Sequence, residues 1–155
     1  MIKNYKQGIS VIELLVVIAV LGIMFLIIFP QFSKMRENQV LKSTIGDVMS
    51  NLNKAKSQTL ASMNSSQYGV HFQSDRVIIF KGITFSANDV NNVTTNITTP
   101  ATISNVTLAG VSGNSGDMYF NRLSGTPDKT GTVTVSTTSF SKIITISATG
   151  SMSVN

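Results

Sequence analysis

One apolar run near the N-terminus limits the folds that are open to this chain. Every residue of Leu14–Phe29 is apolar or glycine, and three more apolar residues precede that range: Ile9, Val11 and Ile12. Only Ser10 and Glu13 interrupt the run. An α-helix rises ~1.5 Å per residue, so about 20 such residues cross the ~30 Å hydrocarbon core of a bilayer. The rest of the 155-residue chain suffices for one modest globular head.

The flanks of the run indicate how it is processed. A secretory signal peptide needs a small-x-small cleavage site after its apolar stretch, and here that side reads IIFPQFSKM. The small residue is instead Gly8, which lies before the run and ends the basic leader MIKNYKQG. Cleavage at Gly8 would remove residues 1–8 and keep the hydrophobic helix.

The segment K-x-x-K-x-G-I-S-V-I-E-L-L-V-V-I-A-V-L-G-I resembles the class III signal of type IV prepilins and type II secretion pseudopilins. The resemblance implies that a prepilin peptidase cuts between Gly8 and Ile9 and that Ile9 is then N-methylated. Glu13 becomes the fifth mature residue, where the family keeps a glutamate. Pro30 matches the proline that ends the family's transmembrane stretch. Ile9 departs from the family, which usually has phenylalanine there.

Glu13 has a physical role in this interpretation. A carboxylate inside lipid costs several kcal/mol unless it lies near the interface or is paired. After cleavage, the free amine of Ile9 lies one helical turn away, and the amine of a neighbouring subunit can pair with Glu13. Such pairing favours one axial register, because a slipped register leaves a buried charge unpaired. The alternative is a juxtamembrane glutamate that only reaches the headgroups.

Pro30 predicts a kink, because proline removes one helical hydrogen bond, or alternatively a plain helix stop. Beyond it, apolar residues recur at intervals of three and four and predict an amphipathic helix to about Ser65. The expected stripe is Leu41, Ile45, Val48, Leu52, Ala55, Thr59 and Met63. Asn51 is expected off this stripe. The domains are therefore a leader at 1–8, a transmembrane and filament-core helix at 9–30, an amphipathic helix at 31–65 and a β-rich head at 66–155.

From Gln67 onward the apolar residues alternate, which predicts strands. A hairpin is expected at 68–80, and further strands at 82–85, 102–108, 118–123, 131–137, 142–148 and 151–155. Residues 86–100 are rich in Asn and Thr and predict a long surface loop, and residues 110–117 predict a flexible connection. The fold class is α+β: a long N-terminal helix packed on a C-terminal antiparallel β-rich head, as in pilins.

Two segments of the head resemble one branch of the family. KAKSQTLASMNSSQYGVHF resembles the passage from the long helix into the first strand of H-type pseudopilins and FimT-like minor pilins. The C-terminal segment resembles their closing strands, which end in I-x-I-x-x-x-G, here Ile144, Ile146 and Gly150. This resemblance implies a low-copy component of a pilus or pseudopilus.

Composition argues against an enzyme. The chain has no cysteine, so it has no disulfide, thiolate metal site or cysteine nucleophile, and His71 is its one histidine. No phosphate-binding loop or hydrolase motif is present. We expect no catalytic residues, no metal and no cofactor. The formal net charge is +5 with charged residues at 12%, a weak indication of an anionic partner.

DNA capture in natural transformation is the alternative function, because some FimT-like minor pilins bind DNA. The head cations that could contact phosphates are dispersed along the sequence: Arg76, Lys81, Arg122, Lys129 and Lys142. The chain also ends in GSMSVN, without the arginine-bearing tail of the DNA-binding relatives.

The main prediction is a minor type IV pilin or type II secretion pseudopilin. Its partners would be a prepilin peptidase and sister pilins that meet the helix of residues 11–29. It would lie in the cytoplasmic membrane as a single-pass protein with its head outside, and later in a filament. Lysine and arginine flank the span on both sides, so orientation follows from the resemblance alone.

Overall fold

The computed structural model describes residues 8–155, and the basic leader at residues 1–7 lies outside the described part. The chain divides into two compact units, one ending at Arg36 and the other formed by Glu37–Asn155, which we call the head. One long helix, α1 (Val11–Leu60), contributes its N-terminal half to the first unit and its C-terminal half to the head.

The helix α1 continues through Pro30, so the alternative that this proline ends the helix is wrong. Proline lacks the N–H that would complete the local i to i−4 hydrogen bond. The helix nevertheless continues for about eight further turns to Leu60, because the amphipathic residues that follow have a core to pack against. It ends before Ser62, whose left-handed backbone (φ 49°) cannot continue a right-handed helix. The predicted end near Ser65 is therefore a few residues too late, and Met63–Ser65 form a separate 3₁₀ turn, η1.

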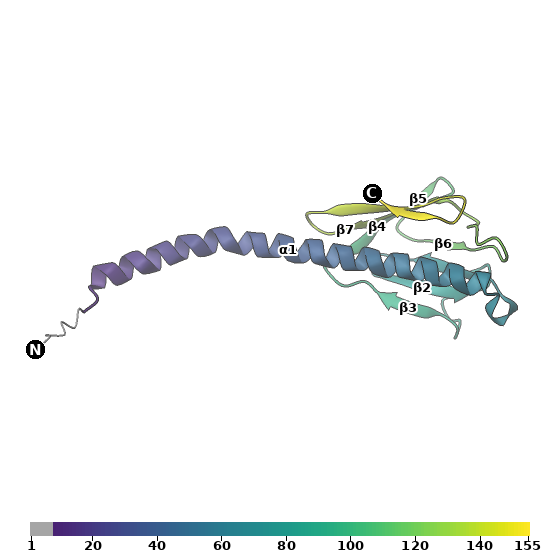
Figure 1. The fold of residues 1–155 in the computed structure, drawn as a ribbon, viewed down its shortest axis with the longest axis horizontal. Coiled ribbons are helices and arrows are strands. Elements are labelled where there is room, and N and C mark those ends of the chain that lie inside the picture. Colours follow the sequence, from purple (N-terminus) through teal and green to yellow (C-terminus); the bar gives the residue numbers. More distant parts are fainter. Residues whose placement is uncertain (1–7) are drawn as a thin grey trace, which may run out of the picture. The chain divides into compact units, whose positions relative to one another are not determined.

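The head adds two antiparallel sheets to the C-terminal half of α1. Their strands are β1 (Tyr68–Phe72), β2 (Arg76–Lys81), β3 (Val93–Asn96), β4 (Thr102–Leu108), β5 (Val111–Gly113), β6 (Gly116–Tyr119), β7 (Gly131–Ser136), β8 (Ser141–Ile146) and β9 (Met152–Val154). One sheet has the order β3-β2-β1-β6, and the other has the order β5-β4-β7-β8-β9. Figure 1 shows both sheets alongside the C-terminal half of α1. The α+β architecture predicted from the sequence is thus confirmed.

One hydrophobic core joins the helix to the two sheets. Val48 and Leu52 of α1 are fully buried and pack in the same cluster as Phe72 of β1 and Ile144 of β8. Every buried member of the cluster lies at or after Leu41, so the head contains its whole core within one unit. The predicted helical stripe is correct for five of its residues: Leu41, Val48, Leu52, Ala55 and Thr59. Ile45 is half-buried and Met63 is exposed, whereas Thr44 and Asn51, not expected on the stripe, are buried.

The strand predicted at 82–85 is wrong. Gly82 has a positive φ of 103°, which turns the chain away from β2. Phe85 then folds back over the outer face of the first sheet, where its ring stacks on His71 with centroids 3.8 Å apart. It also meets the ring of Phe80 edge-on at 5.7 Å. A packed aromatic contact therefore replaces strand pairing in this segment.

Two segments predicted as loops contain strands. Residues 86–100 hold β3, whose Thr95 lies opposite Val77 of β2, because threonine and valine are suited to a half-exposed pleated edge. Residues 110–117 hold β5 and the beginning of β6. The strand predicted at 118–123 ends at Tyr119, and the chain turns at residues 121–124. The hairpin at 68–80 and the strands at 102–108, 131–137, 142–148 and 151–155 are confirmed within a residue or two.

Candidate assembly helix and head surface

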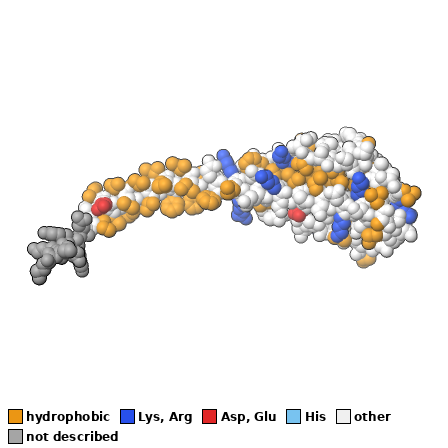
Figure 2. Space-filling view, in the orientation of Figure 1, with side chains coloured by type: hydrophobic (Ala, Val, Ile, Leu, Met, Phe, Trp, Pro, Cys, Tyr) orange, Lys and Arg blue, Asp and Glu red, His pale blue; other side chains and the backbone are white. Residues whose placement is uncertain are grey.

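The N-terminal half of α1 exposes its apolar side chains all round. Val11 is 76% exposed and Leu26 is 78% exposed, and the large apolar residues between them are also exposed. Figure 2 shows this half as a nearly continuous hydrophobic surface with one acidic spot near its beginning. The helix is long and apolar enough to cross a membrane, judged by length and composition. A helix that is hydrophobic on every side requires lipid or other helices around it.

The candidate cleavage site lies just before this helix. Gly8, Ile9 and Ser10 are exposed and not helical, and α1 begins at Val11. A peptide bond in such a segment is accessible to a peptidase, because no helical hydrogen bonds must be broken to extend it. Glu13 lies in the first turn of α1, where a negative charge is favourable near the N-terminal end of the helix dipole. Among residues 8–155 its carboxylate makes no hydrogen bond or ion pair within the chain.

An apolar hollow on the surface of the first unit is lined by residues on both sides of Pro30 in the sequence. Its volume is about 270 Å³, and it is lined by Ile27, Ile28, Gln31, Phe32 and Met35. The rings of Phe25 and Phe29 lie one turn earlier, 6.0 Å apart and tilted by 39°. The structure therefore places a set of large exposed side chains around the predicted kink site.

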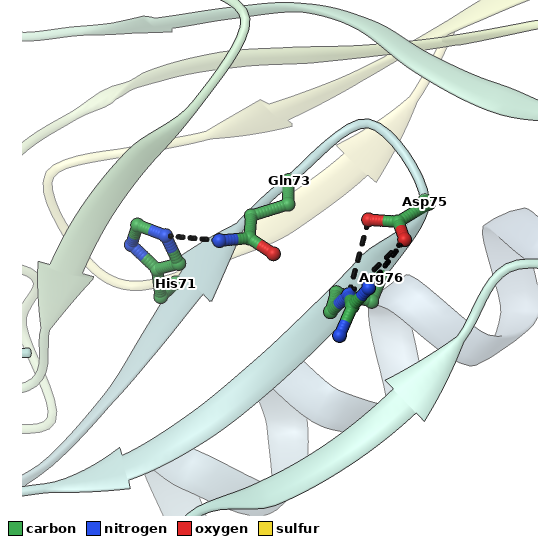
Figure 3. A network of polar contacts seen from close by, with 4 residues as sticks. All are labelled: His71, Gln73, Asp75 and Arg76. Atoms are coloured by element: carbon green, nitrogen blue, oxygen red, sulfur yellow. Dashed lines mark hydrogen bonds and ion pairs between the residues drawn. The ribbon is translucent and has the colours of Figure 1, made fainter. Parts of the chain in front are cut away.

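His71 lies on the outer face of the first sheet in a small polar network (Figure 3). The Gln73 side-chain amide contacts Nε2 of His71 at 3.3 Å, while the buried Nδ1 has no partner within the described residues. Burial lowers the pKa of His71, and the charge of Asp117 on the neighbouring strand β6 partly opposes this. The lowered pKa disfavours the charged form of His71, whose ring packs against Phe85. No group of three or more His, Asp or Glu side chains suited to a metal occurs in the described part of the chain.

Two of the head cations named as DNA candidates are paired with carboxylates. Arg76 makes a bidentate contact with the carboxylate of Asp75, with a shortest distance of 2.6 Å. Lys129 lies 3.8 Å from Asp117 and donates to its backbone carbonyl at 2.8 Å. These two cations are locally neutralised, which weakens their attraction for phosphate.

A cleft of about 270 Å³ lies where the two sheets approach each other, beside this Lys129–Asp117 pair. Its walls include Val106 and Leu108 of β4, Val111 of β5 and Asp117 of β6. The cleft could not be predicted from sequence, because it forms only where β4 and β6 of the two sheets meet in the fold. Two apolar residues in turns, Val90 and Leu123, are strongly exposed, which was not predicted from sequence. The sign available in the sequence was that each is an apolar residue standing alone in a turn-rich stretch.

Comparison with known proteins gives one positive finding. The family model described as the prokaryotic N-terminal methylation motif matches residues 3–29, which include Gly8, Ile9 and Glu13 and stop just before Pro30. Neither the curated proteins nor the solved structures give a match. The motif supports the type IV pilin and pseudopilin family in general, a structural and not an enzymatic family. It implies processing by a prepilin peptidase and assembly with other pilins, and the apolar helix is consistent with a membrane anchor.

Proposed function

We propose that this protein is a minor type IV pilin or type II secretion pseudopilin. Prepilin peptidase cuts between Gly8 and Ile9, and the new N-terminal Ile9 is methylated. The mature chain stays in the cytoplasmic membrane with its head outside until it enters a filament. The observation that carries this proposal is the methylation motif over residues 3–29 on a helix whose apolar surface is exposed all round.

Glu13 acts in assembly in this proposal. It is the one carboxylate between Gly8 and Arg36, and it has no partner among the described residues. A free amine on Ile9 of a neighbouring subunit supplies the missing positive charge. In an apolar filament interior, a misregistered subunit leaves both charges unpaired, which costs several kcal/mol. The charge pair therefore selects the axial position of each new subunit.

Pro30 and the residues after it adapt the helix to this assembly. Proline removes one backbone hydrogen bond, so bending at Pro30 costs less than elsewhere in α1. Phe32 and Met35 lie in the segment that follows and remain exposed in the isolated chain. We propose that this segment packs against neighbouring helices as the subunit leaves the lipid.

Mass spectrometry of the N-terminus tests processing. The protein is expressed with a prepilin peptidase, and we expect a chain that begins at Ile9 and carries one added methyl group. Gly8→Val should leave the leader attached, whereas Ser10→Ala is the matched control and should be processed normally. A chain cleaved elsewhere, or an intact leader in the presence of active peptidase, contradicts the proposal.

Filament incorporation tests Glu13 separately. Glu13→Ala should leave the protein cleaved and in the membrane but absent from purified filaments. Glu13→Asp keeps the charge and should restore part of the incorporation. Normal incorporation of the alanine variant would refute the assembly role.

A DNA-binding titration tests DNA capture, the alternative function that the sequence left open. The head, titrated with double-stranded DNA at low and near-physiological salt, should bind weakly if the assembly role is correct. Micromolar or tighter binding that weakens steeply with salt would favour DNA capture instead.

A further inference from the structure

Two turns of the head expose large apolar side chains almost completely. Val90 is 96% exposed and Leu123 is 89% exposed, more than any other large apolar residue of the head. A single exposed apolar residue is ordinary on a protein surface. These two differ because each directly follows a charged residue, and the charges are opposite: Asp89 precedes Val90 and Arg122 precedes Leu123.

Leu123 is held outward by a strained backbone. Its φ of 68° lies in the left-handed region, which a branched side chain rarely adopts. Arg122 fastens the same turn to the end of α1, because its guanidinium donates to the backbone oxygen of Ser65 at 3.0 Å and to Oγ of Ser62 at 3.4 Å. The strained backbone of Leu123 does not bury its side chain in the head. This combination indicates that the side chain contacts another molecule.

The surface around Leu123 is cationic. Lys56 donates to the backbone oxygen of Gly150 at 2.9 Å, and its side chain also lies against Gly125 of the Leu123 turn. No carboxylate occurs in the three segments that meet here, residues 54–66, 121–127 and 147–151. In Figure 2, the end of the head where α1 finishes shows hydrophobic and basic atoms and no acidic ones. Arg122 and Lys56 each keep further N–H donors for a carboxylate.

The turn at Val90 carries the complementary features. Oδ1 of Asp89 accepts hydrogen bonds from the backbone N–H and the side-chain amide of Asn91, both at 2.8 Å. These bonds, together with the nearby charge of Lys81, lower the pKa of Asp89 and keep the carboxylate charged. Among the described residues, Oδ2 accepts no hydrogen bond. Val90 then extends from the turn beside a fixed negative charge.

We propose that the Arg122–Leu123 turn of one molecule binds the Asp89–Val90 turn of a second copy of this chain. The apolar side chains pack together, and the guanidinium of Arg122 donates to the free oxygen of Asp89. Because the two turns are different surfaces, the contact is heterologous and joins unlike faces of two copies. It is small, so it forms when copies are concentrated in a membrane or a filament. It uses no residue before Glu37, and it is therefore independent of leader cleavage and of Glu13.

Cysteine crosslinking of the full chain in membranes tests the contact, because the natural chain has no cysteine to give background. One copy carries Asn88→Cys and the other Ser124→Cys, which leaves the four proposed contact residues intact. With a short thiol crosslinker, we expect the mixed 88–124 product at least about tenfold above the control pair 88–111 made with Val111→Cys. Equal yields of the two mixed products, or a predominance of 88–88 or 124–124 products, would overturn the proposal.

Exchanging the charges of Arg122 and Asp89 tests whether these residues form the contact between the two copies. Arg122→Glu and Asp89→Arg should each reduce the 88–124 product roughly tenfold, and the two changes together should restore it. Leu123→Asn separates binding from folding, since asparagine tolerates a left-handed backbone but removes the apolar contact. We expect a folded protein with a reduced 88–124 product. Full crosslinking in this variant, or no rescue in a folded double variant, refutes the pairing.

Discussion

Thr59 fastens the end of α1 to the first strand, and its replacement by valine gives a sharp test of the head. The side chain is fully buried, and its Oγ1 accepts a hydrogen bond from the backbone N–H of Tyr68 at 2.9 Å while donating to the backbone oxygen of Ala55 at 2.9 Å. Thr59→Val keeps the shape but leaves the buried N–H of Tyr68 without an acceptor. An unsatisfied buried group of this kind costs about 1–3 kcal/mol.

Urea unfolding of residues 37–155, followed by far-UV circular dichroism, measures this loss. Since m is typically about 1–3 kcal/mol per M, a loss near 2 kcal/mol lowers the midpoint by about 1 M. Thr44→Val is the matched control, because Thr44 is buried in the same helix and its hydroxyl makes no hydrogen bond among the described residues. The reasoning is refuted if both valine variants shift the midpoint equally or if Thr59→Val leaves it unchanged.

Three further changes probe other parts of the head. Gly131→Ala should destabilise it by about 1–3 kcal/mol or more, because a Cβ would overlap the backbone carbonyl of Thr107 on β4; a stable variant would mean that the strands can separate. Gly46→Ala should stabilise it by about 0.5–1 kcal/mol, since that exposed helical site is open to a Cβ, and thermal melting checks the sign. Burial lowers the pKa of His71 below its ordinary 6.5, so the unfolded chain binds the proton more tightly than the folded head does. The free energy of unfolding should therefore fall as the pH drops below 6.5. His71→Gln should reduce this pH dependence.

The candidate assembly residues could be named from sequence because the prepilin motif that they resemble is local. Gly8, Glu13 and Pro30 match that motif along one apolar run, and their roles in cleavage and assembly stay predictions. Local information also suffices for Val48 and Leu52, whose helical period alone predicts their burial.

The rest of the head depends on contacts between residues far apart in sequence. Asn51 is polar and falls off the apolar stripe, yet its Oδ1 accepts from the hydroxyl of Thr95 at 3.1 Å, a residue 44 positions away. Its amide donates to the backbone oxygen of Asp47 at 2.8 Å, so both ends of a buried polar group are satisfied. Phe85 likewise leaves the predicted strand to stack on His71. Periodicity carries no information about partners of this kind.

The separation of the two units determines how the proposals can be tested. The head core contains no buried residue before Leu41, so changes at Glu13 or Pro30 remove no contact from it. A Glu13 variant that fails to assemble while its head unfolds at the normal urea midpoint has therefore lost an interaction between subunits. Conversely, Arg122 and Asp89 lie in turns outside the core, so charge exchange there should leave leader cleavage unchanged. Arg122→Glu also removes two hydrogen bonds to the segment after α1, so the urea midpoint of each head variant is measured alongside crosslinking. Defects in helix assembly and in head contacts can thus be assigned to different residues of the same chain.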